Sequence, residues 1–225
     1  MSTEQATATA TAASGAGTLL AAATRGVGAV RQAPKPLHPR GSVAVARVSR
    51  CTGVATAGVA WLDEPDSDLV LVRRSRAVGL PTRWPDVQGL AMRVALTRGG
   101  VGDLLLASTG WGPRGRFLLH AGRHPETLFF GSLLPYRSSI GPVVLGALPH
   151  GDDSWVLVWA PARGPWQPFA RLELGPTLPG EQVSFDPVLN RLPGLEQYDV
   201  FAQLRLPAYL TARRSRSERL RPAVS

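Results

Sequence analysis

Alternation of apolar and polar residues predicts a chain built mainly of short β-strands. In residues 42–50, Val43 and Arg47 fall on one face of an extended strand, and Ala44 and Val48 fall on the other. Further strands are predicted over residues 69–75, 90–94, 102–109, 117–119, 154–160 and 168–174, with short apolar strands also between residues 127 and 149. The 20 prolines and 24 glycines add many turns, which favours short strands over long helices.

The two ends of the chain differ from this strand-rich part. Residues 1–33 hold a stretch of small residues and then a short apolar segment, so we expect a disordered tail followed by a short helix. Residues 34–216 contain no internal repeat and no long linker, which predicts one domain. Residues 217–225 are expected to be a basic tail.

The charge is strongly positive, yet its pattern does not indicate nucleic-acid binding. The formal net charge is +9, and all of the 25 basic residues except Lys35 are arginines. Aromatic residues do not interleave with these arginines as a base-stacking surface requires, so we expect no nucleic acid partner.

Cysteine content and hydropathy exclude other classes of protein. A single cysteine, Cys51, excludes an intrachain disulfide and a cysteine-rich metal site. No apolar run reaches the roughly 18 residues that a membrane span needs, and no basic and apolar signal sequence is present at the N-terminus. We therefore expect a soluble, cytoplasmic protein without a membrane span.

Candidate chemistry is concentrated near the C-terminus. If the segment around Tyr209 is helical, Arg205, Tyr209 and Arg213 share one face, because residues four apart stack on a helix. A guanidinium beside a phenol favours the phenolate and lowers the pKa of the tyrosine. A phenolate can serve as the oxygen ligand of haem iron. The alternative is a C-terminal amphipathic helix with solvated arginines.

This C-terminal stretch resembles the haem-proximal segment of the catalase superfamily. There F-x-P, then P-G, then R-x-x-x-Y and a run of basic residues occur in the same order. The matching residues here are Phe185, Pro187, Pro193, Gly194, Arg205, Tyr209, Arg213, Arg214 and Arg216. The resemblance implies a mainly β protein with some α, formed as an antiparallel catalase-like β-barrel of about eight strands with a C-terminal helix.

It also implies haem b as the cofactor. Tyr209 would be the axial ligand of the iron, and Arg205 would stabilise its phenolate form. Lys35, Arg73 and either Arg213 or Arg216 would hold the propionates.

A second matching segment precedes the first strand. The family has a basic residue, then three positions later a histidine that opens H-x-basic-G, and here these are Lys35, His38, Arg40 and Gly41. The resemblance implies that His38 is the distal acid/base, a role that the near-neutral pKa of histidine suits. The alternative is a surface histidine beside Pro39.

The predicted second strand carries the family pattern V-R-x-S. Val72, Arg73 and Ser75 supply it, and the resemblance implies that Arg73 pairs with a propionate while Ser75 orients His38. A guanidinium suits a carboxylate partner. The alternative makes Arg73 and Arg74 ordinary outward strand residues.

The distal asparagine of the family is missing. Asp103 and Leu104 match the D-L that precedes it, but its region holds Ala107, Ser108 and Thr109. Ser108 is therefore the candidate for a replacement polar group. We expect peroxidase-type chemistry on peroxides or organic hydroperoxides, or hydroperoxide rearrangement, rather than efficient dismutation of hydrogen peroxide.

Two other functions stay open. One is a metal-dependent hydrolase of the phosphodiesterase type, whose zinc or manganese ligands would come from the histidines and aspartates. The candidates are His38, His120, His124, His150, Asp86, Asp103, Asp152 and Asp153, but none has a compact ligand spacing. The other is a non-catalytic barrel that binds an apolar ligand. The oligomeric state and the organic substrate also stay open.

Overall fold

The computed structural model describes residues 41–97, 99–181 and 183–198. Its principal strands are β1 (Gly41–Arg50), β2 (Ser67–Arg76), β3 (Asp86–Ala95), β4 (Val101–Ser108), β8 (Gly141–Pro149), β9 (Ser154–Pro161) and β10 (Gln167–Thr177). Shorter strands are β5 (Ala121–Gly122), β6 (Phe130–Gly131), β7 (Tyr136–Ser138) and β11 (Glu196–Gln197).

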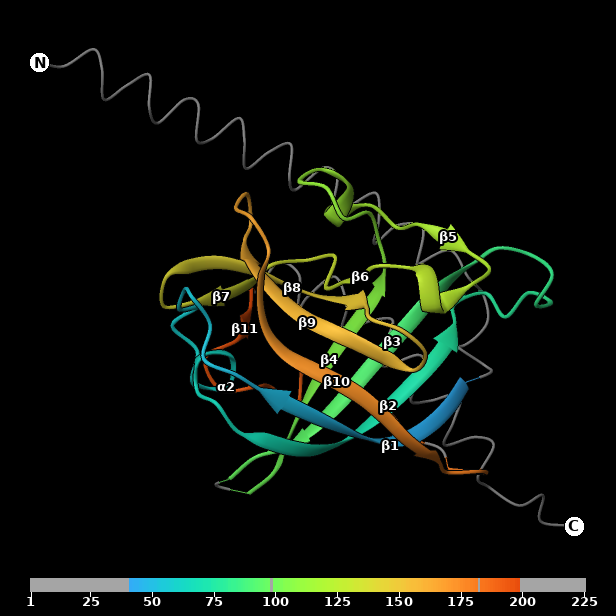
Figure 1. The fold of residues 1–225 in the computed structure, drawn as a ribbon, viewed down its shortest axis with the longest axis horizontal. Helices are drawn as coiled ribbons and strands as arrows, with labels where there is room; N and C mark the ends of the chain where they lie inside the picture. The colour runs from blue at the N-terminus through green and yellow to red at the C-terminus, as the bar shows by residue number, and fades with distance from the viewer. Residues whose placement is uncertain (1–40, 98, 182, 199–225) are drawn as a thin grey trace, which may run out of the picture.

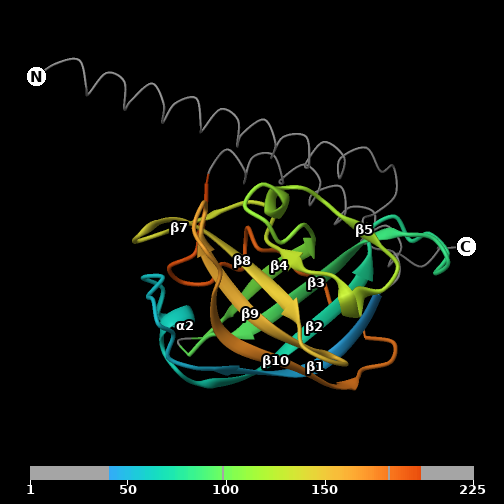
Figure 2. The ribbon, with the colours of Figure 1, turned by 45° about the horizontal axis from the view of Figure 1, so that its top comes forward.

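Eight of these strands form a closed antiparallel barrel. The strand order is β8, β6, β4, β3, β2, β1, β10 and β9, and β9 pairs with β8 to close the ring. In Figures 1 and 2, β8, β9 and β10 form the near wall and β2, β3 and β4 the far wall. The remaining three strands pair outside the ring. The prediction of an antiparallel barrel of about eight strands is confirmed.

The period-two pattern of the sequence decides which side chains fill the barrel. In an extended strand successive side chains point to opposite faces, and the inward positions here are apolar and almost fully buried. They include Val48, Val72, Met92, Leu104, Leu145, Leu157, Trp159 and Leu172. The interior is therefore a packed core, so any sizeable ligand must bind outside it.

Two loops close one end of the barrel. Leu62, from the short helix α2 (Ala60–Asp63), and Leu192 and Leu195, from the chain after β10, belong to the same buried core as the strands. A Cβ at Gly102 would lie 2.6 Å from Leu192 Cγ, so only glycine at position 102 leaves room for the Leu192 side chain at this end of the barrel.

Helix is scarce in the described residues. They contain one α-helix of four residues, α2, and two 3₁₀ turns, η1 (Gly115–Phe117) and η2 (Pro125–Thr127). The predicted N-terminal tail and short helix, C-terminal helix and basic tail lie outside the described residues. Within the part that the structure describes, no helix is long and apolar enough to cross a lipid bilayer.

The strand predicted at residues 117–119 is wrong. The chain makes a 3₁₀ turn there, followed by a single bridge between Thr109 and Leu119. The cause is a close crossing of two backbones, because a Cβ at Gly110 would lie 2.9 Å from Gly115 Cα. The Gly110 amide also donates to the Gly115 carbonyl at 3.0 Å. This turn leaves no room for an extended strand.

Candidate functional site

Arg73 and Ser75 lie on the outer face of the barrel. Val70 and Val72 of the same strand are buried in the core, so the alternating residues Arg73 and Ser75 point outward. Arg74 points the other way and pairs with Asp153 at the barrel rim, at 2.5 Å. The predicted roles of Arg73 as a propionate partner and of Ser75 as the residue that orients His38 stay predictions.

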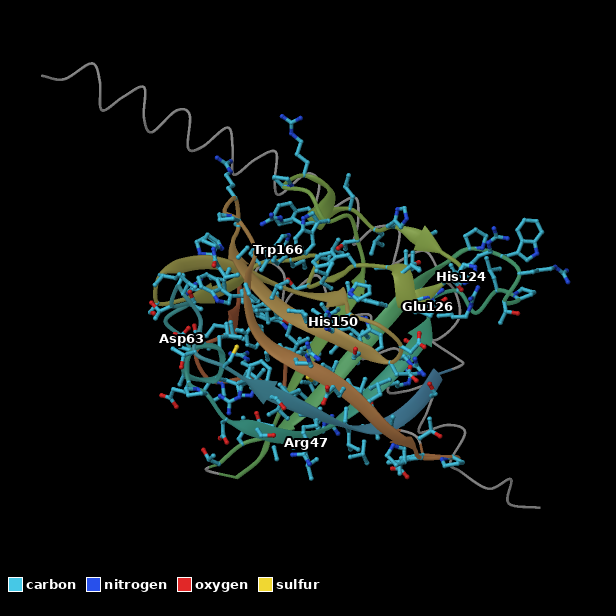
Figure 3. The ribbon with its side chains drawn as sticks, in the orientation of Figure 1. Arg47, Asp63, His124, Glu126, His150 and Trp166 are labelled. Carbon is cyan, nitrogen blue, oxygen red and sulfur yellow. The ribbon has the colours of Figure 1, made fainter. Side chains whose placement is uncertain are left out.

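Strand pairing arranges the outward residues of β1 to β4 in rows. The first row holds Gly41, Ser75, Gly89 and Ala107, and the second holds Val43, Arg73, Ala91 and Leu105. We call these eight residues the platform. Apart from Arg73 and Ser75 its members are small or apolar, and four strands spaced about 4.8 Å apart make it roughly 14 Å wide. Arg47, labelled in Figure 3, belongs to the same outer face of β1.

Gly41 lets the Arg73 side chain cross the edge of the platform. A Cβ at Gly41 would lie 2.9 Å from Arg73 Nε and 3.0 Å from Arg73 Nη2. Any larger residue would displace the guanidinium or the strand. Arg73 and Ser75 each interact with another group in the structure. A ligand held by Arg73 would therefore have to exchange with an existing contact.

An ion pair forms the next row and borders the platform. Asp103 is fully buried at its side chain and accepts two hydrogen bonds from Arg93, from Nε and Nη2, both at 2.7 Å. This hydrogen bonding raises the pKa of Arg93, although partial burial opposes the shift. Asp103 also accepts from the Asp186 amide and from Asn190 Nδ2, each at 2.7 Å.

The ion pair fixes the chain that follows β10 against the outer face. Besides the bonds to Asp103, Arg93 donates to the Ser184 carbonyl at 2.6 Å, and its guanidinium lies 5.1 Å from the centre of the Phe185 ring. The F-x-P motif at Phe185 and Pro187 thus lies beside the platform. Two motifs that are more than a hundred residues apart in the sequence meet on one side of the barrel.

Ser108 faces away from the platform. It is completely buried, and its hydroxyl accepts from the Gln88 amide at 3.0 Å and donates to the His120 carbonyl at 2.5 Å. Ala107 is the neighbouring residue that points to the platform. In this structure Ser108 therefore joins β3 and β4 to the loop that carries His120, and its predicted catalytic role receives no support from the geometry.

The other predicted site residues lie outside the described residues. They are Lys35, His38, Arg205, Tyr209, Arg213 and Arg216. The assignments of Tyr209 to iron and of His38 to proton transfer therefore stay predictions. Of the predicted set, the structure brings together Arg73 and Ser75.

The histidines and acids of the described residues do not converge on a metal site. Over residues 41–97, 99–181 and 183–198 there is no group of three side chains of the His, Cys, Asp or Glu type suited to a metal ion. His124 Nδ1 instead lies 3.1 Å from Glu126 Oε1, and His150 Nε2 lies 2.9 Å from Arg171 Nη2. Figure 3 labels His124, Glu126 and His150.

A closed eight-stranded antiparallel barrel of this topology is the fold found in catalases. Three solved structures illustrate the likeness. A fungal catalase aligns with a TM-score of 0.60 at 12% identity, covering 84% of this chain and 60% of its own. Catalase A from Saccharomyces cerevisiae gives 0.58 at 12% identity, with coverage of 80% and 60%. A bacterial catalase gives 0.55 at 14% identity, with coverage of 80% and 57%.

The similarity between this chain and the three catalases is a similarity of fold. No protein-family model matches the chain, and no curated protein matches it in sequence. The chain spans about three fifths of the length of these catalases. The fold is therefore catalase-like.

Proposed function

We propose that the protein binds haem b on the platform and acts on peroxides or organic hydroperoxides. The observation that carries this proposal is the platform itself, two rows of mostly small or apolar outward residues that include Arg73 and Ser75, on a barrel with a catalase-like fold. A soluble, cytoplasmic location, expected from the composition, belongs to the same proposal.

The described residues fit a flat apolar macrocycle with acidic side groups. Gly89, Ala91 and Ala107 place no bulky side chain between the strands and a ring lying on them. Ala91 and Leu105 are partly exposed, so apolar area remains to be buried by a ligand. The Arg73 guanidinium suits a propionate, because it can donate two parallel hydrogen bonds to a carboxylate.

Bound haem would supply the redox chemistry needed to cleave a peroxide bond. In this proposal Tyr209 would hold the iron, and Arg205 would keep its phenol deprotonated. His38 would take a proton from the peroxide and return it to the leaving oxygen, while Ser75 would orient its ring. Lys35, and Arg213 or Arg216, would share the propionates with Arg73.

Peroxidase-type chemistry or hydroperoxide rearrangement is favoured over dismutation. On the platform, β4 contributes Ala107, whose methyl group can neither donate nor accept a hydrogen bond. Ser108 is not part of this proposal, because its hydroxyl faces the other side of β4 and bonds to Gln88 and His120.

The test is the absorption spectrum and iron content of protein produced with a haem precursor. We expect a Soret band with about one iron per chain, and its loss or conversion to a weakly ligated form in Tyr209→Phe. Ala91→Trp should abolish haem binding, because the indole occupies the platform. Ala95→Trp is the matched control, since it lies on the same face of β3 but about 13 Å further along the strand, beyond the Arg93–Asp103 pair.

Three results contradict the proposal. They are absence of haem even after addition of hemin, an unchanged spectrum in Tyr209→Phe, and equal haem content in Ala91→Trp and Ala95→Trp. Absence of haem would leave the non-catalytic apolar-ligand barrel as the function to pursue.

A further inference from the structure

A second candidate site lies where the loop after β4 packs against β8 and β9. The loop after β4 and the β9–β10 hairpin enclose an open pocket with a volume of about 410 Å³. Trp111, Arg116, Arg163 and Trp166 contribute to its wall. Trp166 is labelled in Figure 3. None of the described residues that line this pocket belongs to the platform.

Arg116 is a buried cation for which the described residues supply no acidic partner. Only 3% of the residue is exposed, and burial lowers the pKa of its guanidinium. Nη1 donates to the carbonyls of Pro161 at 3.4 Å and Gly164 at 3.1 Å, whereas Nε has no hydrogen-bond partner among the residues that the structure describes. Buried charges in proteins are normally paired, so a bound anion would supply the partner that the Arg116 guanidinium needs.

Aromatic rings make the rest of the wall. The Arg116 guanidinium lies 4.4 Å from the centre of the Trp166 ring. Trp166 Nε1 donates to the Trp111 carbonyl at 2.9 Å, and the two indole rings lie 5.6 Å apart. Phe129 packs against both of them. These contacts hold the wall in place before any ligand binds, which reduces the entropy cost of binding.

We infer that this pocket binds a small aromatic carboxylate. The carboxylate would accept from the terminal Nη2 of Arg116, since Nε is buried, with the exposed Arg163 adding positive charge. The apolar body would lie against the indoles, which favour aromatic partners. The volume lies within the range of small-molecule sites, roughly 300–1,000 Å³. An inorganic anion would leave the indole walls unused.

Benzoate is the probe, and benzamide is its neutral isostere. Calorimetric titration of the full chain should detect benzoate binding, with benzamide at least about tenfold weaker because it lacks the charge. Arg116→Met should weaken benzoate binding by about tenfold or more. Gly112→Trp should abolish it by filling the pocket, since a Cβ at Gly112 meets nothing within 4 Å and the fold can accept the substitution.

The inference does not depend on haem. Ala91→Trp, which blocks the platform, should bind benzoate like the unmodified protein, so failure of one proposal is distinguishable from failure of the other. Unchanged benzoate binding in Arg116→Met or Gly112→Trp overturns the inference. So do equal affinities for benzoate and benzamide, or for benzoate and phosphate. Where Arg116→Met does not fold, Gly112→Trp and the benzamide comparison decide.

Discussion

Asp103→Asn is the substitution whose effect can be worked out most fully from the structure. The carboxylate is buried and accepts four hydrogen bonds of 2.7 Å, two from Arg93 and one each from the Asp186 amide and Asn190. An asparagine of nearly the same shape would present a donor NH₂ to at least one of these donors. It would also leave the Arg93 charge without its partner.

The expected loss follows from the exposure of the two partners. Removing one member of a buried ion pair costs roughly 3–5 kcal/mol. Asp103 is fully buried but the Arg93 side chain is 22% exposed, so water relieves part of the loss and about 3 kcal/mol is expected. For a domain of this size, that corresponds to a fall in melting temperature of about 6–12 °C.

Urea unfolding followed by tryptophan fluorescence measures this loss. Asp153→Asn is the matched control, because it breaks the exposed pair with Arg74 and should cost about 0–1 kcal/mol. Asp153 has a φ of 53°, a conformation that asparagine also adopts. Equal stability of the two variants would refute the reasoning. Hydrogen exchange should also accelerate at the Asp186 amide in Asp103→Asn alone.

We expect the titration of Arg93 to add no pH dependence near neutrality to the difference in unfolding free energy between Asp103→Asn and the unmodified protein. Because the pKa of Arg93 is raised in the folded protein, its contribution is complete below the ordinary pKa of arginine and is lost only as pH rises through the raised value. Between about pH 6 and 9 the titration of Arg93 therefore adds no slope. A steep dependence there would mean that another group controls the pair.

Two further predictions separate packing from chemistry. Ser108→Ala should lower the unfolding free energy by about 1–3 kcal/mol, because the Gln88 amide and the His120 carbonyl lose their partner. Peroxide reactivity of the haem-loaded protein should be unchanged, and normal stability with lost reactivity would restore a catalytic role. Gly102→Ala should cost about 1–3 kcal/mol by pushing on Leu192. A double-mutant cycle with Leu192→Ala should be less than additive, and strict additivity would contradict the contact.

Period-two alternation was enough to predict most of the barrel. The strands over residues 42–50, 69–75 and 154–160 carry a clear inward apolar face, and each is present with slightly wider bounds. The segment from 110 to 117 could not be predicted in the same way. Its shape depends on the approach of Gly110 to Gly115 and on the packing of Arg116 against Trp166, contacts that no local period encodes.

The candidate site was predictable only where residues lie two apart on one strand. Arg73 and Ser75 share a face for that reason. The choice between Ala107 and Ser108 needs the exact register of β4, and a shift of one residue exchanges the two faces. The partners of Asp103 come from residues 186 and 190, far along the chain, so sequence spacing alone could not reveal them.

The pairing of β1 with β10 has a consequence during synthesis. β10 lies more than a hundred residues after β1, so at ribosomal speed β1 waits on the order of 10 s for its second neighbour. Throughout this time one edge of β1 has unpaired backbone groups that could pair with another chain. Arg47 and Arg50 lie on this strand, and positive charge is a means of keeping such an edge from joining others. The nascent chain thus carries its own protection against association until the barrel can close.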